Sequence, residues 1–149
     1  DIAKIVSGSV STKPYATTGD YSYEMTSFSG HRYILTGDAA RFVDPIFSSG
    51  VSIAMNGARE ASFAVAEALD SGLFGTNGFE QYDLKMKTAC NNWYRFSQLY
   101  YSMDTLFTYL IQHPKFRLTT LRLLQGDVFD DLFEEYFLEV DKISRKFDL

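Results

Sequence analysis

Several residue types and segments are scarce in this sequence, and each scarcity excludes a class of protein. The single cysteine, Cys90, leaves no partner for an internal disulfide and fits a reducing cytoplasm, where we expect the protein to reside. No apolar run approaches the roughly 20 residues that span a bilayer, so we expect no transmembrane segment. The net charge of −5 argues against a nucleic-acid partner, because phosphate binding needs a basic surface.

The residues that are abundant describe an ordinary globular domain. Hydrophobic residues make up 46% and charged residues 22% of the 149 positions, enough to bury one sizeable core. Aromatic side chains are unusually frequent, with 13 Phe and 10 Tyr, and most of them follow residue 78. The chain begins without Met inside what reads as an ongoing fold, so we expect it to be a fragment of a longer enzyme.

Apolar residues at spacings of three and four predict helices over most of the chain. The first helix covers Val51–Leu69, Gly72 is placed to end it, and a turn-rich linker follows at Leu73–Gly78. A long helix runs from Phe79 to Tyr100. Three shorter helices follow: one capped by Ser102 or Asp104 and stopped by His113-Pro114, one over Lys115–Gln125, and a last one that begins at Asp127 or Asp130.

Two short extended segments are predicted before these helices. Tyr21–Phe28 alternates loosely and is rich in aromatic residues, and Arg32–Thr36 returns after a turn. We therefore expect these two segments to pair as a β-hairpin. Residues 2–7 fit either a short strand or the end of a helix.

The stretch Tyr33–Ala54, which reads YILTGDAARFVDPIFSSGVSIA, organises the rest of the chain. An apolar run opens it as a strand, Gly37 and Asp38 break that strand, and small residues after Gly50 begin a helix. The first amides of a helix lack partners within it and point outward. Such a junction therefore commonly holds an anion or a nucleotide cofactor.

Two features of this junction carry candidate chemistry, and each has a structural alternative. The Asp38 carboxylate can accept hydrogen bonds from the hydroxyls of a ribityl or ribose group, or it caps the next turn. The amides of Ser49 and Gly50 form an anion-accepting pocket, or the side chain of Ser48 or Ser49 simply caps the helix. The anion pocket and the helix cap are compatible with each other. The Asp44-Pro45 pair is predicted to be turn chemistry.

Other reactive residue types are predicted to be structural. Arg41 lies on the surface or contacts a phosphate, and we favour the surface. His31 and His113 lack the spacing of metal ligands, so we expect no metal site. Cys90 is expected to be a buried, inert thiol. The aromatic stripe Tyr94–Tyr109 walls a substrate pocket or packs between helices, and we favour packing.

The central stretch resembles a known cofactor motif. GDAARFVDPIFSSGVSIA is similar to the second FAD-binding motif of the flavoprotein monooxygenase superfamily, and the form GDAAxFxDPxFSSGV resembles the FADH2-dependent halogenases. Two later stretches, NNWYRFSQLYYSMDTLF and HPKFRLTTLRLLQGDVFDD, resemble the C-terminal helical region of that family. The likeness extends from about Tyr21 to Asp131 and covers most of the chain.

The resemblance implies a fold class and a domain organisation. The class is α+β, mainly α. Residues 1–75 would be the C-terminal part of an FAD-binding α/β domain, with its strand segment or β-hairpin, the GDAA loop and a helix. Residues 76–149 would form a helical C-terminal domain.

The resemblance also implies roles for residues of the motif. Asp38 would hydrogen-bond the ribityl chain of FAD, and the helix N-terminus would favour negative charge on reduced flavin. Chloride or bromide would bind to the amides of Ser49 and Gly50. The implied cofactor-binding residues are Gly37, Asp38, Pro45, Gly50 and Val51.

Parts of the family pattern are missing from the sequence. The G-x-G-x-x-G dinucleotide fingerprint and the W-x-W-x-I-P signature are absent. Neither Lys4 nor Lys13 lies in a motif that matches the lysine used by the family, so the catalytic residue is unknown and expected outside this chain. Ser52 stands where relatives often carry His.

The resemblance implies that the chain is the C-terminal fragment of a flavin-dependent halogenase, an oxidoreductase of secondary metabolism. The parent would take reduced FAD from a flavin reductase, with O2 and chloride or bromide, and halogenate an electron-rich aromatic or pyrrolic substrate, free or bound to a carrier protein. The fragment would depend on the N-terminal FAD-binding portion and be inactive alone. One alternative is an FAD-dependent hydroxylase or reductase of the same superfamily, and another is a non-catalytic helical interaction module.

Overall fold

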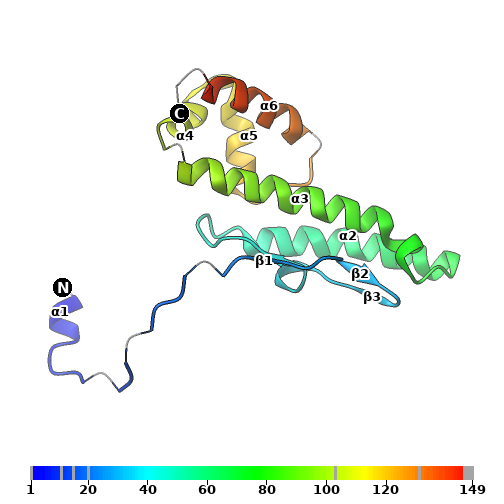
Figure 1. Ribbon diagram of the computed structural model, residues 1–149, viewed down its shortest axis with the longest axis horizontal. Helices are drawn as coiled ribbons and strands as arrows, with labels where there is room; N and C mark the ends of the chain where they lie inside the picture. Colours follow the sequence, from blue (N-terminus) through cyan, green and yellow to red (C-terminus); the bar gives the residue numbers. More distant parts are fainter. Residues whose placement is uncertain are drawn as a thin grey trace.

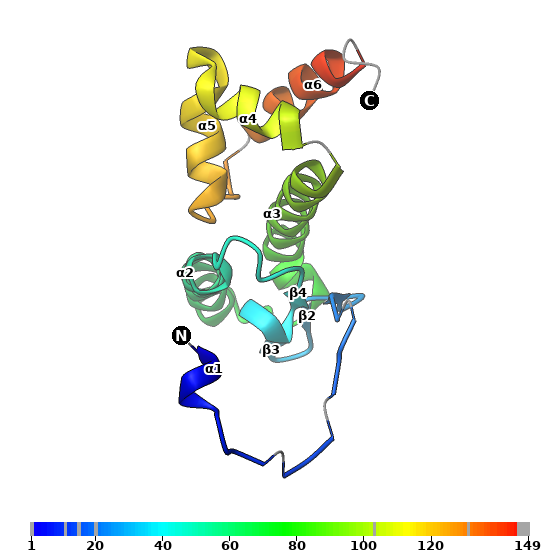
Figure 2. The same ribbon diagram turned by 90° about the vertical axis from the view of Figure 1, so that its left-hand side faces the viewer.

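The computed structural model describes residues 2–10, 12–14, 16–19, 21–102, 104–130 and 132–145, and helices dominate it (Figure 1). The longest helix, α3 (Thr76–Ser102), lies between two groups of elements. One group holds α2 (Gly50–Ser71) and the strands, and the other holds α4 (Asp104–Gln112), α5 (Pro114–Leu124) and α6 (Leu132–Ser144) (Figure 2). The predicted class, α+β and mainly α, is confirmed.

The strands form two separate two-stranded sheets, both antiparallel. In one sheet β1 (Tyr23–Glu24) pairs with β4 (Arg41–Phe42), and Tyr23 lies opposite Phe42. In the other sheet β2 (Ser29–Gly30) pairs with β3 (Tyr33–Ile34). The N-terminal residues form a single exposed helical turn, α1 (Ile2–Ile5), apart from the other elements (Figure 1).

The predicted β-hairpin is present, but most of the predicted segment Tyr21–Phe28 does not take part in it, because the first strand, β2, lies at Ser29–Gly30, where the sequence predicted a turn. The chain reverses directly after β2, where Arg32 takes a left-handed φ of 65°. Each strand of the hairpin holds two residues, and beyond them the Leu35 amide donates to the Phe28 carbonyl at 2.7 Å. Phe28 is fully buried at the start of that hairpin. The segment before it is left to pair with β4, which lies inside the central stretch where the sequence predicted a loop.

Small residues let α2 approach α3 closely. Gly57 and Ala68 are buried, and a Cβ atom at Gly57 would lie 3.0 Å from Met86 Cε on α3. The sequence predicted that this helix packs closely on a sheet or a cofactor, and its buried face packs on α3 and on the 3₁₀ turn η1 (Gly37–Ala39). The helix ends as predicted at Gly72, whose φ of 74° is left-handed.

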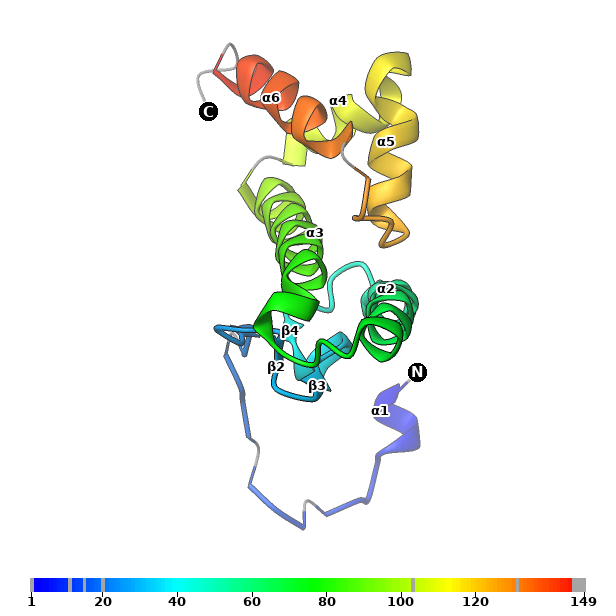
Figure 3. The same ribbon diagram turned by 90° about the vertical axis from the view of Figure 1, so that its right-hand side faces the viewer.

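α3 contributes to the hydrophobic core of both groups of elements (Figure 3). It begins at Thr76, which shortens the predicted linker. Near this end Tyr82 is buried with Phe28, and its hydroxyl donates to the Leu35 carbonyl at 2.6 Å. Near the other end Trp93 is buried in a larger cluster with residues of α4, α5 and α6. Within the described ranges, no helix has the length and apolarity needed to cross a bilayer.

The turn between α4 and α5 follows the predicted chemistry. His113 is the N-cap of α5, and Pro114 occupies the first helical position, where its missing N–H is not needed. The His113 Nδ1 atom accepts a hydrogen bond from the Lys115 amide at 3.3 Å. The predicted stop of the preceding helix at His113-Pro114 is therefore confirmed, since α4 ends at Gln112.

The last helix follows Asp130, one of its two predicted starts. α6 begins at Leu132, and the Asp130 carboxylate accepts from the Leu132 amide at 2.9 Å. Arg122 on α5 bonds to Asp127 at 2.7 Å and to Asp130 at 2.8 Å. These two ion pairs fix the loop ahead of the helix, and the Asp130 carbonyl also accepts from the Phe133 amide at 3.3 Å. Of the two predicted starts, Asp130 is therefore confirmed as the residue that caps the helix, and Asp127 lies in the loop before it.

Candidate functional site

The first part of the site is the turn that follows β3. Gly37 opens η1 with a left-handed φ of 54°, and a Cβ atom there would lie only 3.0 Å from the Cβ of Ala54 on α2. Glycine therefore lets this turn lie against the helix. Asp38 is exposed within η1, and its main-chain carbonyl accepts from the Tyr23 hydroxyl. The N-cap of η1 is Thr36, so Asp38 does not occupy the capping position.

The second part is the loop over residues 43–49. The Asp44 carboxylate accepts from the Ile46 amide at 2.8 Å, and the Ser48 amide donates to the Pro45 carbonyl at 2.9 Å. These bonds confirm Asp44 and Pro45 as turn residues. Asp44 also accepts from the Tyr101 hydroxyl on α3, at 3.2 Å and 3.1 Å to its two oxygens.

The third part is the N-terminus of α2. Ser49 is the N-cap, but its hydroxyl makes no capping bond and donates instead to the Leu124 carbonyl at 2.8 Å. Ser48 has a left-handed φ of 54° and Ser49 a right-handed φ of −90°. Successive residues of opposite hand turn their amides toward one point and form an anion-binding concavity. The interpretation of Ser49 as a side-chain cap is therefore wrong, and its side chain does not cover the first amides.

These three parts meet in one open groove. Its volume is about 380 Å³, within the range of ligand pockets. Four of the five predicted cofactor-binding residues line it. Of the two predicted halide-binding residues, Gly50 lines it, and Ser49 is buried and does not. The lining residues are Asp38, Phe42, Asp44, Pro45, Ser48, Gly50, Val51 and Ala54.

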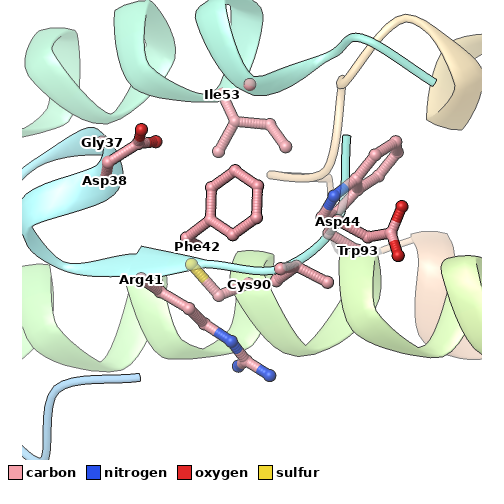
Figure 4. A pocket seen from close by; sticks show the side chains of 10 residues that line it. Gly37, Asp38, Arg41, Phe42, Asp44, Ile53, Cys90 and Trp93 are labelled. Carbon is pink, nitrogen blue, oxygen red and sulfur yellow. The ribbon is translucent and has the colours of Figure 1, made fainter. Parts of the chain in front are cut away.

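A smaller cavity of about 40 Å³ adjoins the groove and shares Asp38, Phe42, Asp44 and Gly50 with it (Figure 4). Gly37, the fifth predicted residue, lines this cavity, and so do Cys90 and Trp93 of α3. Figure 4 shows the Asp38 and Asp44 carboxylates on opposite sides of Phe42. The structure thus brings every predicted cofactor-binding residue to one place.

Arg41, which the sequence placed on the surface, is enclosed by other side chains. Its side chain is only 9% exposed, and it pairs with Glu24 at 3.3 Å. It also donates to the Asn91 side chain at 2.9 Å and lies 5.4 Å from the centre of the Tyr94 ring. The surface interpretation is therefore wrong, because these contacts join β4 to β1 and α3.

Cys90 is buried, as predicted, at the base of the small cavity. Burial raises the pKa of its thiol to about 11, an effect that the nearby Arg41 charge partly opposes. The thiol therefore stays protonated at neutral pH, which confirms the expectation of an inert cysteine. In the described part of the chain, no group of three or more His, Cys, Asp or Glu residues is arranged to hold a metal ion.

Phe47 is a structural residue of the site that the sequence did not single out. From the loop it reaches the core cluster and contacts four aromatic rings of α3 and α4. The packing interpretation of the aromatic stripe is confirmed for Phe96 and Phe107, which are buried, whereas Tyr94 and Tyr101 are exposed. A bulky aromatic residue inside a loop of small and turn-forming residues was the available signal.

Comparison with known proteins identifies relatives of the chain. It is 48% identical over 117 residues to the 1H-pyrrole-2-carbonyl-(peptidyl-carrier protein) chlorinase of Pseudomonas fluorescens, covering 78% of this chain and 26% of that protein. It is 34% identical over 113 residues to the corresponding brominase of Pseudoalteromonas luteoviolacea, covering 74% and 27%. No protein-family profile matches the chain.

The fold has a solved counterpart. The structure of the flavin-dependent brominase Bmp2 superimposes with a TM-score of 0.68 at 30% sequence identity, over 81% of this chain and 32% of that one. The chain thus spans about a quarter of the length of the two curated relatives. The resemblance predicted from the GDAA motif is confirmed. The chain is homologous to the flavin-dependent halogenases, which are enzymes, and corresponds to a portion of their length.

Proposed function

We propose that this chain is the C-terminal portion of a flavin-dependent halogenase and supplies one side of its flavin and halide site. The observation that carries the proposal is the groove at the start of α2, where Asp38, Pro45, Gly50 and Val51 converge. Residues 1–75 would complete the FAD-binding domain, and residues 76–149 would form the helical domain beside it. The relatives' names support this assignment.

The groove fits a flavin in shape and in chemistry. A Cβ atom at Gly50 would meet no atom within 4 Å, so the backbone there faces open space. Asp38 would accept from the ribityl hydroxyls, while Pro45 and the amides of Gly50 and Val51 would lie along the pyrimidine edge. The positive end of the α2 dipole would stabilise negative charge there. When bound, reduced FAD would supply the two electrons that reduce O2 to the peroxide level, the oxidant that then takes two electrons from the halide.

The concavity at Ser48 and Ser49 suits a halide ion. The amides of Ser49 and Gly50 would donate to chloride or bromide, and amide donors carry no competing charge. Two carboxylates line the same groove, which opposes an anion. Asp44 accepts from the Ile46 amide and the Tyr101 hydroxyl, and these donors offset part of its field.

The remaining assignments follow from the relatives. We propose a pyrrolyl substrate carried on a peptidyl-carrier protein, because both curated relatives carry that substrate in their names. A flavin reductase would supply reduced FAD, and the enzyme would act in the cytoplasm. The N-terminal FAD-binding portion of the parent would provide the rest of the cofactor site and the catalytic lysine. Alone, this chain would be inactive.

The flavin assignment is tested by Asp38→Ala in the full-length parent. Losing a charge-assisted hydrogen bond should weaken FAD binding roughly tenfold to hundredfold, measured by the flavin absorbance that the purified enzyme retains. Asp70→Ala, at the exposed far end of α2, is the matched control and should retain FAD. Equal FAD retention by the two variants would overturn the assigned role of Asp38.

The reaction itself is tested by product analysis of the full-length parent with and without chloride or bromide. Halogen in the product only when halide is present supports the halogenase. A hydroxylated product with no incorporated halogen would instead identify the hydroxylase alternative of the same superfamily.

A further inference from the structure

Phe47 connects the cofactor loop to the helical core. Its ring stacks on Phe107 of α4, with centres 5.9 Å apart and planes 7° apart. It meets Tyr100 edge-on at 5.0 Å and Trp93 edge-on at 5.6 Å, and it lies 5.3 Å from Phe96. All three of these rings belong to α3. A loop side chain held by four rings fixes the backbone that carries it.

Two further bonds attach the same loop to the helices. Before Phe47, the Asp44 carboxylate accepts from the Tyr101 hydroxyl at the end of α3. After Phe47, the Ser49 hydroxyl donates to the Leu124 carbonyl at the end of α5. The loop is thus held by helices on both sides of the ring.

The held backbone includes an unfavourable conformation. Ser48 has a left-handed φ of 54°, which residues other than glycine rarely adopt. Such a conformation persists where surrounding contacts over-determine it. Here the Phe47 ring precedes Ser48 directly and the Ser49 hydroxyl bond follows it, so the helical core fixes the directions of the next two amides.

We propose that Phe47 is a positioning residue that aims the Ser49 and Gly50 amides at the halide. This role rests on the proposed function, which takes those amides as the halide donors. Hydrogen bonds weaken steeply as their angle departs from linearity, so a small shift of the loop reduces halide affinity. Asp38 lies on the separate turn η1, so its proposed contact with flavin does not depend on the Phe47 ring, whereas the proposed flavin contact of the Gly50 amide does.

The test compares Phe47→Leu and Phe47→Ala in the full-length parent with FAD bound. Chloride affinity is measured by chloride NMR line broadening, which requires no turnover. In Phe47→Ala the chloride dissociation constant should rise about tenfold, as expected when one charge-assisted hydrogen bond is misdirected, and in Phe47→Leu it should rise less. The FAD dissociation constant should rise by a smaller factor than the chloride constant, because the proposed flavin contact of Asp38 on η1 is kept while the Gly50 amide shifts. The emission of Trp93 reports in the 149-residue chain whether the ring contact is lost.

The matched controls are Phe116→Leu and Phe116→Ala. Phe116 is buried in the same core cluster, and its ring contacts Tyr109, His113 and Tyr136 away from the loop. These variants should lower the melting temperature and leave the chloride constant unchanged. The proposal is overturned if Phe47→Ala lowers the melting temperature without changing chloride affinity, or if Phe116→Ala weakens chloride equally. If the parent binds chloride but makes no halogenated product, the proposed function is overturned instead. The chloride dissociation constants of the Phe47 and Phe116 variants still decide whether Phe47 positions the amides.

Discussion

Asp38 and Asp44 line the same groove, but their carboxylates have different surroundings. Asp44 accepts hydrogen bonds from the Ile46 amide and the Tyr101 hydroxyl, so its oxygens are already used to shape the loop. Asp38 is exposed in η1, where the Tyr23 hydroxyl bonds to its main chain. Of the two aspartates, Asp38 is therefore the better acceptor for the hydroxyls of a bound cofactor.

Glu139 on α6 should make stability depend on pH. It accepts from Lys115 of α5 at 2.8 Å and from Lys142 at 3.0 Å, and these two ammonium groups lower its pKa to about 2. A lowered pKa stabilises the fold fully above the ordinary value of 4.5, and this contribution is lost as the pH falls to about 2. At neutral pH, Glu139→Gln should therefore melt at a lower temperature than the unchanged chain, and the two should converge in acid.

The control for this measurement is the substitution Glu134→Gln. Glu134 is an exposed residue of the same helix, and its substitution leaves both lysine contacts of Glu139 intact, so the melting temperature should stay close to that of the unchanged chain. The Glu139 contacts are accessible to solvent, so added salt should shrink the difference in melting temperature. A difference between Glu139→Gln and the unchanged chain that stayed constant from neutral to acidic pH would contradict the assigned pKa.

At the scale of elements, Gly126 holds the α5–α6 loop against the start of α2. Its φ is 79°, and a Cβ atom there would lie 3.0 Å from Ser49 Cβ and 3.1 Å from Ser52 Cβ. Gly126→Ala must both strain the backbone and push the loop away from the helix. We expect the free energy of unfolding in urea to fall by roughly 2–3 kcal/mol.

Gly72→Ala separates the two causes. Gly72 has a similar φ of 74°, but a Cβ atom there would meet nothing within 4 Å. This variant carries only the left-handed strain, about 1 kcal/mol. The excess loss in Gly126→Ala measures the contact with Ser49 and Ser52, and equal losses would refute that contact.

The helices could be predicted from the sequence, whereas the strands could be predicted only in part: β1 and β3 lie inside predicted extended segments, but β2 lies in a predicted turn and β4 in a predicted loop. The segments Val51–Leu69 and Phe79–Tyr100 repeat apolar residues at threes and fours over several turns, which is a strong signal. Each strand is only two residues long, too short for alternation to appear. β4 forms because its edge meets β1, a pairing that nothing within Arg41–Phe42 encodes.

The candidate site divides in the same way. Gly37, Asp38, Pro45, Gly50 and Val51 could be predicted because they belong to one contiguous motif, whose turns bring them together locally. Their supports come from distant parts of the chain, such as the bond from the Ser49 hydroxyl to α5 and the rings of α3 and α4 around Phe47. No local period or spacing encodes such contacts.

At the scale of the whole molecule, α2 exposes a long apolar face that the described core does not use. Val51, Met55, Val65 and Leu69 follow helical spacing, and they are 72%, 70%, 41% and 65% exposed. Soluble proteins rarely gather several large exposed apolar side chains on one helix face unless it is an interaction site. Val51 also lines the groove, so the face is continuous with the proposed flavin site. The chain spans about a quarter of the relatives' length, and we expect the N-terminal portion of the parent to cover this face.

Co-expression of this chain with that N-terminal portion tests the expectation. Each buried Met or Leu side chain contributes about 1.5–3 kcal/mol, so Met55→Glu or Leu69→Glu should weaken association at least about tenfold and lower the FAD recovered with the complex. Leu118→Glu, on α5 and 71% exposed, introduces the same charge away from α2 and should change neither quantity. Without the N-terminal portion, each variant should melt at the same temperature as the unchanged chain, because these side chains are exposed in the chain itself. Equal losses of association in the α2 variants and in Leu118→Glu would mean that added charge, and not the apolar face of α2, weakens the complex.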